Sequence, residues 1–222
     1  MKRSRIFYTK MYEGLEAAIA SLLNSQPDYM TAHTAESPRA AGDAIQDVVC
    51  NGFKEILEDL DLCAEYSARF ARRAMADLAF NDRDGFYYVV DVKTHRLGAA
   101  FSMPNLTSVE RIARFYEDDS NYFVVLLIQY DVQGVKIEVK DVHFVPIEFL
   151  AWECLTVGAL GWGQIQIANA NRVSIKIGSS RRKWMLQLCD VMLDFYPREI
   201  AKIGERIGYF ERLKTSWQRR PD

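Results

Sequence analysis

Residues 85–94 read GFYYVVDVKT, a run of aromatic and β-branched side chains interrupted by Asp91 and Lys93. Such a run favours a strand, and alternation along a strand places Asp91 and Lys93 on the same face, two residues apart. The preceding run MADLAFN, residues 75–81, is also strand-like, and residues 82–85, DRDG, have the chemistry of a tight turn. We therefore expect a β-hairpin that carries a partly desolvated carboxylate and ammonium on its second strand.

Composition limits the class of protein. The chain has 222 residues, 49% of them apolar and 12% aromatic, which is enough for one well-developed core. A net charge of -2 argues against disorder and against a polycationic coat, so any affinity for nucleic acid must come from local basic groups. Four widely spaced cysteines without C-x-x-C spacing favour reduced thiols over zinc or disulfides. No stretch approaches the roughly 20 apolar residues of a membrane span, and charged residues interrupt any signal-peptide core, so we expect a soluble cytoplasmic protein with no membrane partner.

Apolar residues at helical spacing predict several helices. Thr107 followed three residues later by Glu110 predicts a capping box that opens one of them. The expected helices span residues 6–23, 42–60 and 107–116, a short one lies around residues 147–155, and two closing helices cover residues 181–196 and 198–213.

Further strands follow the hairpin. Residues 121–131, NYFVVLLIQYD, are apolar on both faces, as a central strand is. Residues 135–145 and 164–177 are the other two expected strands, and the glycine-rich stretch VGALGWG precedes the last one.

The hairpin brings possible metal ligands together. Asp77 lies in the first strand, so folding back over the turn can place its carboxylate beside Asp91. Two adjacent carboxylates repel each other unless a hard cation such as Mg²⁺ binds them, and Mg²⁺ prefers one or two carboxylates with waters and phosphate oxygens. Lys93 can orient a water and stabilise an anionic transition state. Two alternatives stay open: an ordinary surface ion pair, or a first acid supplied by Asp82 or Asp84 in the turn.

Several patches in the same order resemble the PD-(D/E)xK nucleases, and most closely type II restriction endonucleases of the EcoRV and HincII kind. They are the hairpin with FYYVVDVKTHR, then PNLTSVERIA, and also AAGDAIQDVVCNGFKE, GQIQI and SSRRKW, which cover most of the chain from Ala40 onward. The sequence departs from the signature at Ala76, where the superfamily has proline. The segment between Leu60 and Met75 is also shorter than in enzymes of the HincII kind.

The resemblance implies a fold and a site. The fold would be α+β (α/β/α), with a central mixed β-sheet, a catalytic hairpin and flanking helices in a single domain over residues 1–222. Within it, residues 1–24 would form an N-terminal helix and a possible dimer contact, residues 40–178 the catalytic core, and residues 179–222 the C-terminal helices. Asp77, Asp91 and Val92 would hold Mg²⁺, and Asp77, Asp91, Lys93 and Gln46 would be catalytic. Gln46 is equally well explained as a core polar residue bonded to backbone.

The resemblance also makes the loop after the catalytic strand a DNA-contacting segment. Phe101 would be an aromatic wedge between base pairs, unless it packs into its own core. Asn105 could bond a base edge, although Pro-Asn before a helix is also ordinary capping chemistry. Ser102 and Met103 complete the loop.

Two later segments are further DNA-binding candidates. Gln164 and Gln166 alternate onto one face, and Asn169 and Asn171 extend this polar strip, which could instead be the solvated face of an edge strand. A basic group at an expected helix N-terminus suits phosphate; its members are Arg181, Arg182 and Lys183.

The expected function is that of a type II restriction endonuclease, which cuts both strands of double-stranded DNA at a short palindromic site and leaves 5′-phosphate ends. Palindromic cutting implies a twofold homodimer. The alternatives are a repair or recombination nuclease of the same superfamily and a non-catalytic DNA-binding module with a structural ion.

Overall fold

The computed structural model describes residues 3–25, 31, 36–66, 76–99 and 101–221. The chain forms two compact units, Met1–Ser179 and Ser180–Asp222. Met75, the first residue of the expected hairpin, lies outside the described residues.

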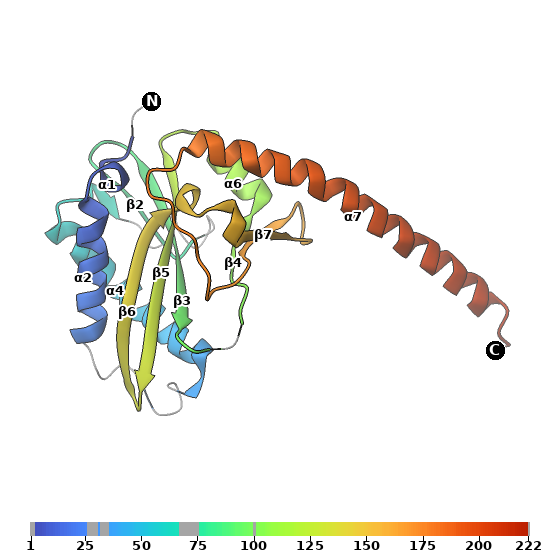
Figure 1. Cartoon of the computed structure of the whole chain (residues 1–222), viewed down its shortest axis with the longest axis horizontal. Helices are drawn as coiled ribbons and strands as arrows, with labels where there is room; N and C mark the ends of the chain where they lie inside the picture. The colour runs from blue at the N-terminus through green and yellow to red at the C-terminus, as the bar shows by residue number, and fades with distance from the viewer. Residues whose placement is uncertain (1–2, 26–30, 32–35, 67–75, 100, 222) are drawn as a thin grey trace. The chain divides into compact units, whose positions relative to one another are not determined.

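The first unit is built on a five-stranded mixed sheet of order β1-β2-β3-β5-β6 (Figure 1). β3 and β5 are parallel, whereas the other neighbouring strands are antiparallel. The mixed α+β architecture is therefore confirmed, and the doubly apolar strand β5 lies in the interior of the sheet, between β3 and β6. The strands are β1 (Glu65–Tyr66), β2 (Leu78–Asn81), β3 (Tyr87–Arg96), β5 (Asn121–Gln133) and β6 (Lys136–Pro146).

The hairpin of β2 and β3 forms as predicted. Leu78 pairs with Val90 and Asn81 with Tyr87. Gly85 has φ 85°, a left-handed conformation that a glycine adopts without a Cβ penalty, and this closes the turn. The Asp82 carboxylate accepts hydrogen bonds from the Asp84 and Phe86 backbone N–H groups and from the Tyr88 hydroxyl, at 2.9, 2.9 and 2.6 Å. Asp82 therefore stabilises the turn.

Helices lie on both faces of β3. Gly42 of α4 (Pro38–Asp59) approaches Thr94 so closely that an added Cβ would be 2.5 Å from Thr94 Oγ1. Thr94 alternates with the residues of the other face, where the Tyr87 ring lies 6.1 Å from the Phe115 ring of α6 (Val109–Phe115). α4 thus covers one face of β3 and α6 the other.

The N-terminal segment differs in detail from the prediction, because it forms two helices, α1 (Arg5–Tyr8) and α2 (Met11–Ser25). The Thr9 hydroxyl donates to the Arg5 carbonyl and accepts from the Met11 N–H, which ends one helix and starts the next. α2 lies alongside β6 (Figure 1), and Glu16 accepts a hydrogen bond from the Phe144 backbone N–H at 2.8 Å. Its apolar stripe is buried within the first unit.

The expected capping box at Thr107 is wrong. Thr107 is buried in β4 (Asn105–Ser108), and Ser108 is the N-cap of α6, since its hydroxyl accepts from the Arg111 N–H. β4 pairs with β8 (Gln164–Ile167), which pairs with β7 (Leu155–Gly158), so a second, three-stranded sheet forms where a loop and a glycine-rich stretch were expected.

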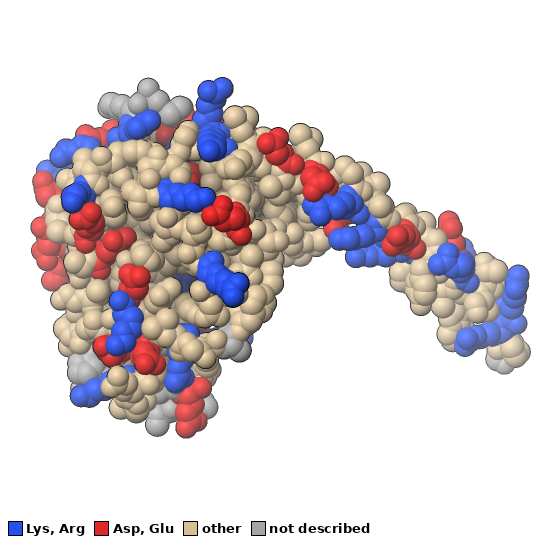
Figure 2. All heavy atoms as spheres, viewed as in Figure 1, with Lys and Arg blue, Asp and Glu red and all other residues tan. Residues whose placement is uncertain are grey.

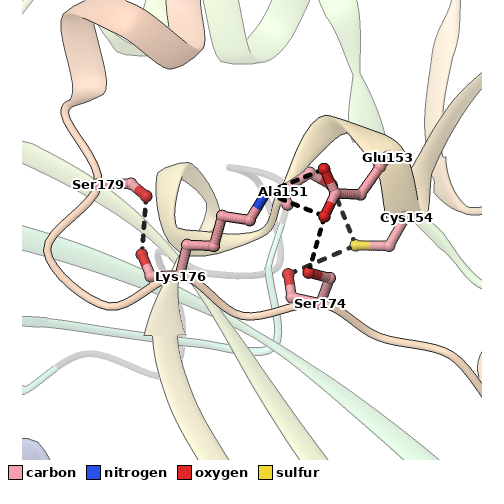
Figure 3. Close-up of polar contacts among 6 residues, drawn as sticks. All are labelled: Ala151, Glu153, Cys154, Ser174, Lys176 and Ser179. Carbon is pink, nitrogen blue, oxygen red and sulfur yellow. Dashed lines mark hydrogen bonds and ion pairs between the residues drawn. The ribbon is translucent and has the colours of Figure 1, made fainter.

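The expected strand over residues 164–177 is also too long. After β8 the chain is irregular. It is bonded to a segment that forms two 3-10 turns, η1 (Ile147–Phe149) and η2 (Trp152–Cys154), in place of the expected short helix. Figure 3 shows Glu153 accepting from both Ser174 and Lys176, the latter at 2.9 Å. The Ala151 backbone N–H also donates to the Ser174 carbonyl at 2.9 Å.

The second unit contains one helix, α7 (Arg181–Gln218), where two helices separated at Pro197 were expected. A proline removes one N–H donor but does not have to end a helix whose neighbouring turn is stabilised. Across this turn the Arg198 side chain donates to both the carbonyl and the carboxylate of Asp194, at 3.1 and 2.6 Å. Among the described residues, no helix combines the length and apolarity needed to cross a lipid bilayer.

Candidate active site

Asp77 lies directly before β2, beside β3. The regular pairing of the hairpin ends at Leu78 and Val90, and the Asp77 N–H donates to the carbonyl of this same Val90 at 2.9 Å. Both carboxylate oxygens are engaged: Oδ1 accepts from Gln46 Nε2 at 2.6 Å and Oδ2 from the Val92 N–H at 2.8 Å. α4 and β3 therefore fix the orientation of this carboxylate.

Gln46 consequently bonds a side chain rather than backbone. Its place on the inward face of α4 brings the amide to Asp77, and this was one of the two interpretations of Gln46 from sequence.

Asp91 is a buried carboxylate with one unsatisfied oxygen. The residue is 6% exposed, and its Oδ1 forms an ion pair with Lys93 Nζ at 2.7 Å. Its Oδ2 is buried and makes no hydrogen bond among the described residues. A buried carboxylate oxygen without a donor carries an uncompensated desolvation cost, so this atom marks a position where a cation or a donor would be stabilised.

Burial raises the pKa of Asp91 to about 7; the Lys93 ammonium and its hydrogen bond oppose this increase, and the Asp77 carboxylate adds to it. A raised carboxyl pKa caused by burial and a neighbouring carboxylate is a property of functional sites more often than of ordinary surface ion pairs.

The donor set fits a small divalent cation. Within the described part of the chain, no group of three or more His, Cys, Asp and Glu side chains gathers in a metal-binding arrangement. Mg²⁺ needs only one or two carboxylates, since waters and substrate oxygens complete its octahedron. Asp77 and Asp91 supply the carboxylates. The Val92 carbonyl leaves β3 on the same side as its N–H, beyond the first residue of β2, and is the candidate backbone ligand.

The alternative first acids lie at the other end of the hairpin. Asp82 pairs with the turn N–H groups and with Tyr88, and Asp84 is an exposed turn residue. Neither is near the start of β2, where Asp77 stands.

The candidate DNA loop is exposed. Phe101 is 63% exposed and Met103 41%, so Phe101 does not pack into the core, which was the alternative explanation of this residue. Ser102 is also exposed, and its carbonyl accepts from the Ala170 N–H, which connects the loop to the segment after β8.

The polar strip lies beside this loop. Asn105 pairs with Gln166 across β4 and β8, and Gln166 Nε2 donates to Asn105 Oδ1 at 2.6 Å. Gln164 is the next residue on the same face of β8. Asn169 accepts from the Asn171 N–H, and the Asn171 side chain bonds His95 Nε2 at 2.8 Å.

His95 is a residue of this region that the sequence interpretation did not assign. It follows Asp91 and Lys93 at the next alternate position of β3, and this spacing could have indicated it. A small cavity of about 60 Å³ is lined by Lys93, His95, Pro104 and Ala170, among other residues. The cavity lies within the first unit, among β3, the end of the exposed loop and the segment after β8.

The basic candidates belong to the second unit. Arg181, Arg182 and Lys183 form the first turn of α7, as predicted, and the Ser180 hydroxyl accepts from the Lys183 N–H as the N-cap. On the face displayed in Figure 2, basic side chains are interspersed with acidic ones, in accord with a net charge of -2.

Comparison of the chain with models of known protein families gives no match, and a search of curated protein sequences gives none either.

Proposed function

We propose that this protein is a type II restriction endonuclease that hydrolyses phosphodiester bonds of double-stranded DNA with Mg²⁺ as cofactor, at a short palindromic site, as a twofold homodimer. The observation that carries the proposal is the buried Asp91 carboxylate, which has Asp77 as a neighbouring carboxylate, pairs with the Lys93 ammonium through Oδ1, and makes no hydrogen bond through Oδ2 within the described part of the chain. The likeness of the sequence patches to the PD-(D/E)xK nucleases agrees with it.

Each residue would have a separate part in the hydrolysis. Asp77 and Asp91, with the Val92 carbonyl, would hold Mg²⁺, which when bound polarises the phosphate and lowers the pKa of a coordinated water. Gln46 and the Val92 N–H keep the Asp77 carboxylate in one orientation.

Lys93 would act on the charge that develops during attack. Its ammonium, held 2.7 Å from Asp91, would orient the attacking water and stabilise the negative charge on the phosphate oxygens. The water oxygen bonds to phosphorus, the bond to the 3′ oxygen breaks, and that oxygen takes a proton, which leaves 5′-phosphate and 3′-hydroxyl ends.

The exposed loop and the polar strip would bind the duplex. Phe101 would insert between base pairs, since an exposed aromatic ring can unstack and bend DNA. The paired amides of Asn105 and Gln166 lie at the neighbouring surface and can contact base edges.

The test is cleavage of linear phage DNA by the full chain with Mg²⁺. Asp91→Ala and Lys93→Ala should abolish cutting, whereas Asp84→Ala and Lys140→Ala, exposed charges away from the site, should leave it unchanged. Discrete fragments support the proposal. Cutting confined to branched or mismatched DNA would instead indicate a repair nuclease, binding without cutting would remove the enzymatic function, and full activity of Lys93→Ala would refute the site.

A further inference from the structure

α7 presents an apolar stripe with the spacing of a coiled coil. Six large apolar side chains form this stripe between residues 193 and 217, and each is between 50 and 74% exposed. Their steps are seven, three, four, three and seven residues, so all fall on the a and d positions of one heptad repeat over three and a half heptads. They are Leu193, Ile200, Ile203, Ile207, Phe210 and Trp217.

This heptad stripe is narrow on the helix surface. At 100° per residue the six positions stay within about 120°, and they drift by about 20° per heptad, as a seven-residue repeat does on a straight α-helix. Tyr209, which is also exposed, falls on the opposite side of the helix. Figure 2 shows uncharged surface running along α7 between its charged side chains. Single exposed apolar residues are ordinary, but six that share one narrow stripe of a helix indicate a partner.

The charged residues beside the stripe favour a second copy in parallel register. Arg206 is at a g position and Glu211 at the following e position, five residues later, and parallel coiled coils pair these two positions between chains. Two Arg206–Glu211 pairs would therefore form, one on each side of the dimer. An antiparallel pairing that aligns Ile203 with Ile207 of the other copy would bring Arg206 against Arg206 instead.

The heptad also contains a polar position. Lys214 occupies an a position between Phe210 and Trp217. A single lysine at an a position costs stability but specifies register and a low number of chains, because its ammonium must reach solvent.

We propose that α7 is a dimerisation helix, which forms a parallel, in-register two-stranded coiled coil with α7 of a second copy through the heptad stripe. The proposal rests on the heptad spacing of the apolar residues and on the charges beside them, and it does not depend on nuclease activity. The coiled coil would, however, be the interface of the homodimer proposed above. It differs from the N-terminal helix suggested by sequence, whose apolar stripe packs inside the first unit.

The first experiment measures the mass of the full chain by sedimentation equilibrium at micromolar concentration, without DNA or Mg²⁺. We expect a dimer for the natural sequence and at least 100-fold weaker association for Ile203→Glu/Ile207→Glu, with unchanged helix content by circular dichroism. Tyr209→Glu, the matched control on the other side of α7, should dimerise normally. A monomeric natural chain, association that survives the double substitution, or a monomer that binds anionic lipid vesicles would overturn the proposal.

The second experiment tests orientation. In a Cys189→Ser background, Ile207→Cys should give a covalent dimer on mild oxidation, since equivalent a positions face each other only in a parallel, in-register pair. Tyr209→Cys should remain uncrosslinked. Failure of Ile207→Cys to crosslink, while the chain still dimerises, would refute the parallel arrangement. Neither experiment measures cleavage. A protein that dimerises through α7 but does not cut DNA would therefore refute the nuclease proposal and leave the dimerisation proposal standing.

Discussion

Asp91→Asn should change how the stability of this protein depends on pH. In the unfolded chain the Asp91 carboxyl loses its proton near its ordinary pKa of 3.8, whereas burial in the folded state raises that pKa to about 7. Between these values the folded state binds more protons than the unfolded state, so the free energy of unfolding falls as pH rises and becomes constant above about pH 7. Asparagine cannot ionise and removes this fall.

The size of the effect follows from the two pKa values. A difference of about three pKa units corresponds to about 4 kcal/mol, of which about 2–3 kcal/mol is lost between pH 5 and pH 8. With EDTA present, the free energy of unfolding of Asp91→Asn minus that of the natural protein should therefore increase by about 2–3 kcal/mol over this range. The small exposure of Asp91, 6%, means that solvent screens this difference little.

The assay is urea denaturation at four pH values from 5 to 8, followed by circular dichroism. Asp47→Asn, an exposed aspartate on α4, is the control and should follow the natural protein. Lys93→Met should steepen the fall above pH 7, because the ammonium that lowers the Asp91 pKa is gone. Millimolar Mg²⁺ should flatten the natural curve by stabilising the ionised carboxylate. If the free energies of unfolding of Asp91→Asn and of the natural protein differ by the same amount at pH 5 and pH 8, ionisation of the buried carboxylate does not destabilise the fold, and the prediction is refuted.

Three further predictions concern other parts of the first unit. Gln46→Ala should weaken Mg²⁺ binding and cleavage by about 10–100-fold, because the Asp77 carboxylate loses its amide donor. Gln46→Glu should be equally impaired, since a carboxylate cannot donate to Asp77. Calorimetry measures the binding and a cleavage assay the rate. Phe101→Ala should change the free energy of unfolding by less than about 0.5 kcal/mol, since the ring is exposed, yet weaken DNA bending in a fluorescence energy transfer assay; unchanged bending would contradict the wedge. Gly42→Ala should destabilise the unit by about 1–3 kcal/mol, because the methyl group would overlap Thr94 Oγ1, and a Gly42→Ala/Thr94→Ala double variant should recover most of the loss.

The hairpin and the long strands were predictable because their information is local. The turn chemistry of residues 82–85 and the alternation of Asp91 and Lys93 in an apolar strand required no knowledge of distant contacts. The same holds for Asp77, because a known turn determines which residue of the first strand reaches the second. Gln46 depended on how α4 docks on the sheet, and only the resemblance indicated it.

The errors occurred where tertiary contacts or side-chain bonds override local rules. Pro197 predicted a helix end, but α7 continues through it, and the Arg198 side chain bonds Asp194 across the same turn. Thr107 has good capping chemistry, yet pairing of β4 with β8 places it in a strand and leaves the cap to Ser108. The heptad stripe of α7 was missed because splitting the helix at Pro197 hid a repeat that spans both halves.

The short length of β2 explains why the Asp77 carboxylate and the destabilising Asp91 carboxylate lie together. β2 begins at Leu78, so the Val92 N–H has no strand partner there and donates to the Asp77 carboxylate instead. If β2 were longer, a backbone carbonyl of β2 would accept the hydrogen bond of the Val92 N–H, and the Asp77 carboxylate would not be needed there. Ending the strand early leaves the Asp77 and Asp91 carboxylates and the Val92 carbonyl together beside the first residue of β2, at a cost in stability that grows as Asp91 ionises. A cation at this edge would offset that cost, so folding and metal binding would reinforce each other most strongly above pH 7, where the carboxylate is ionised.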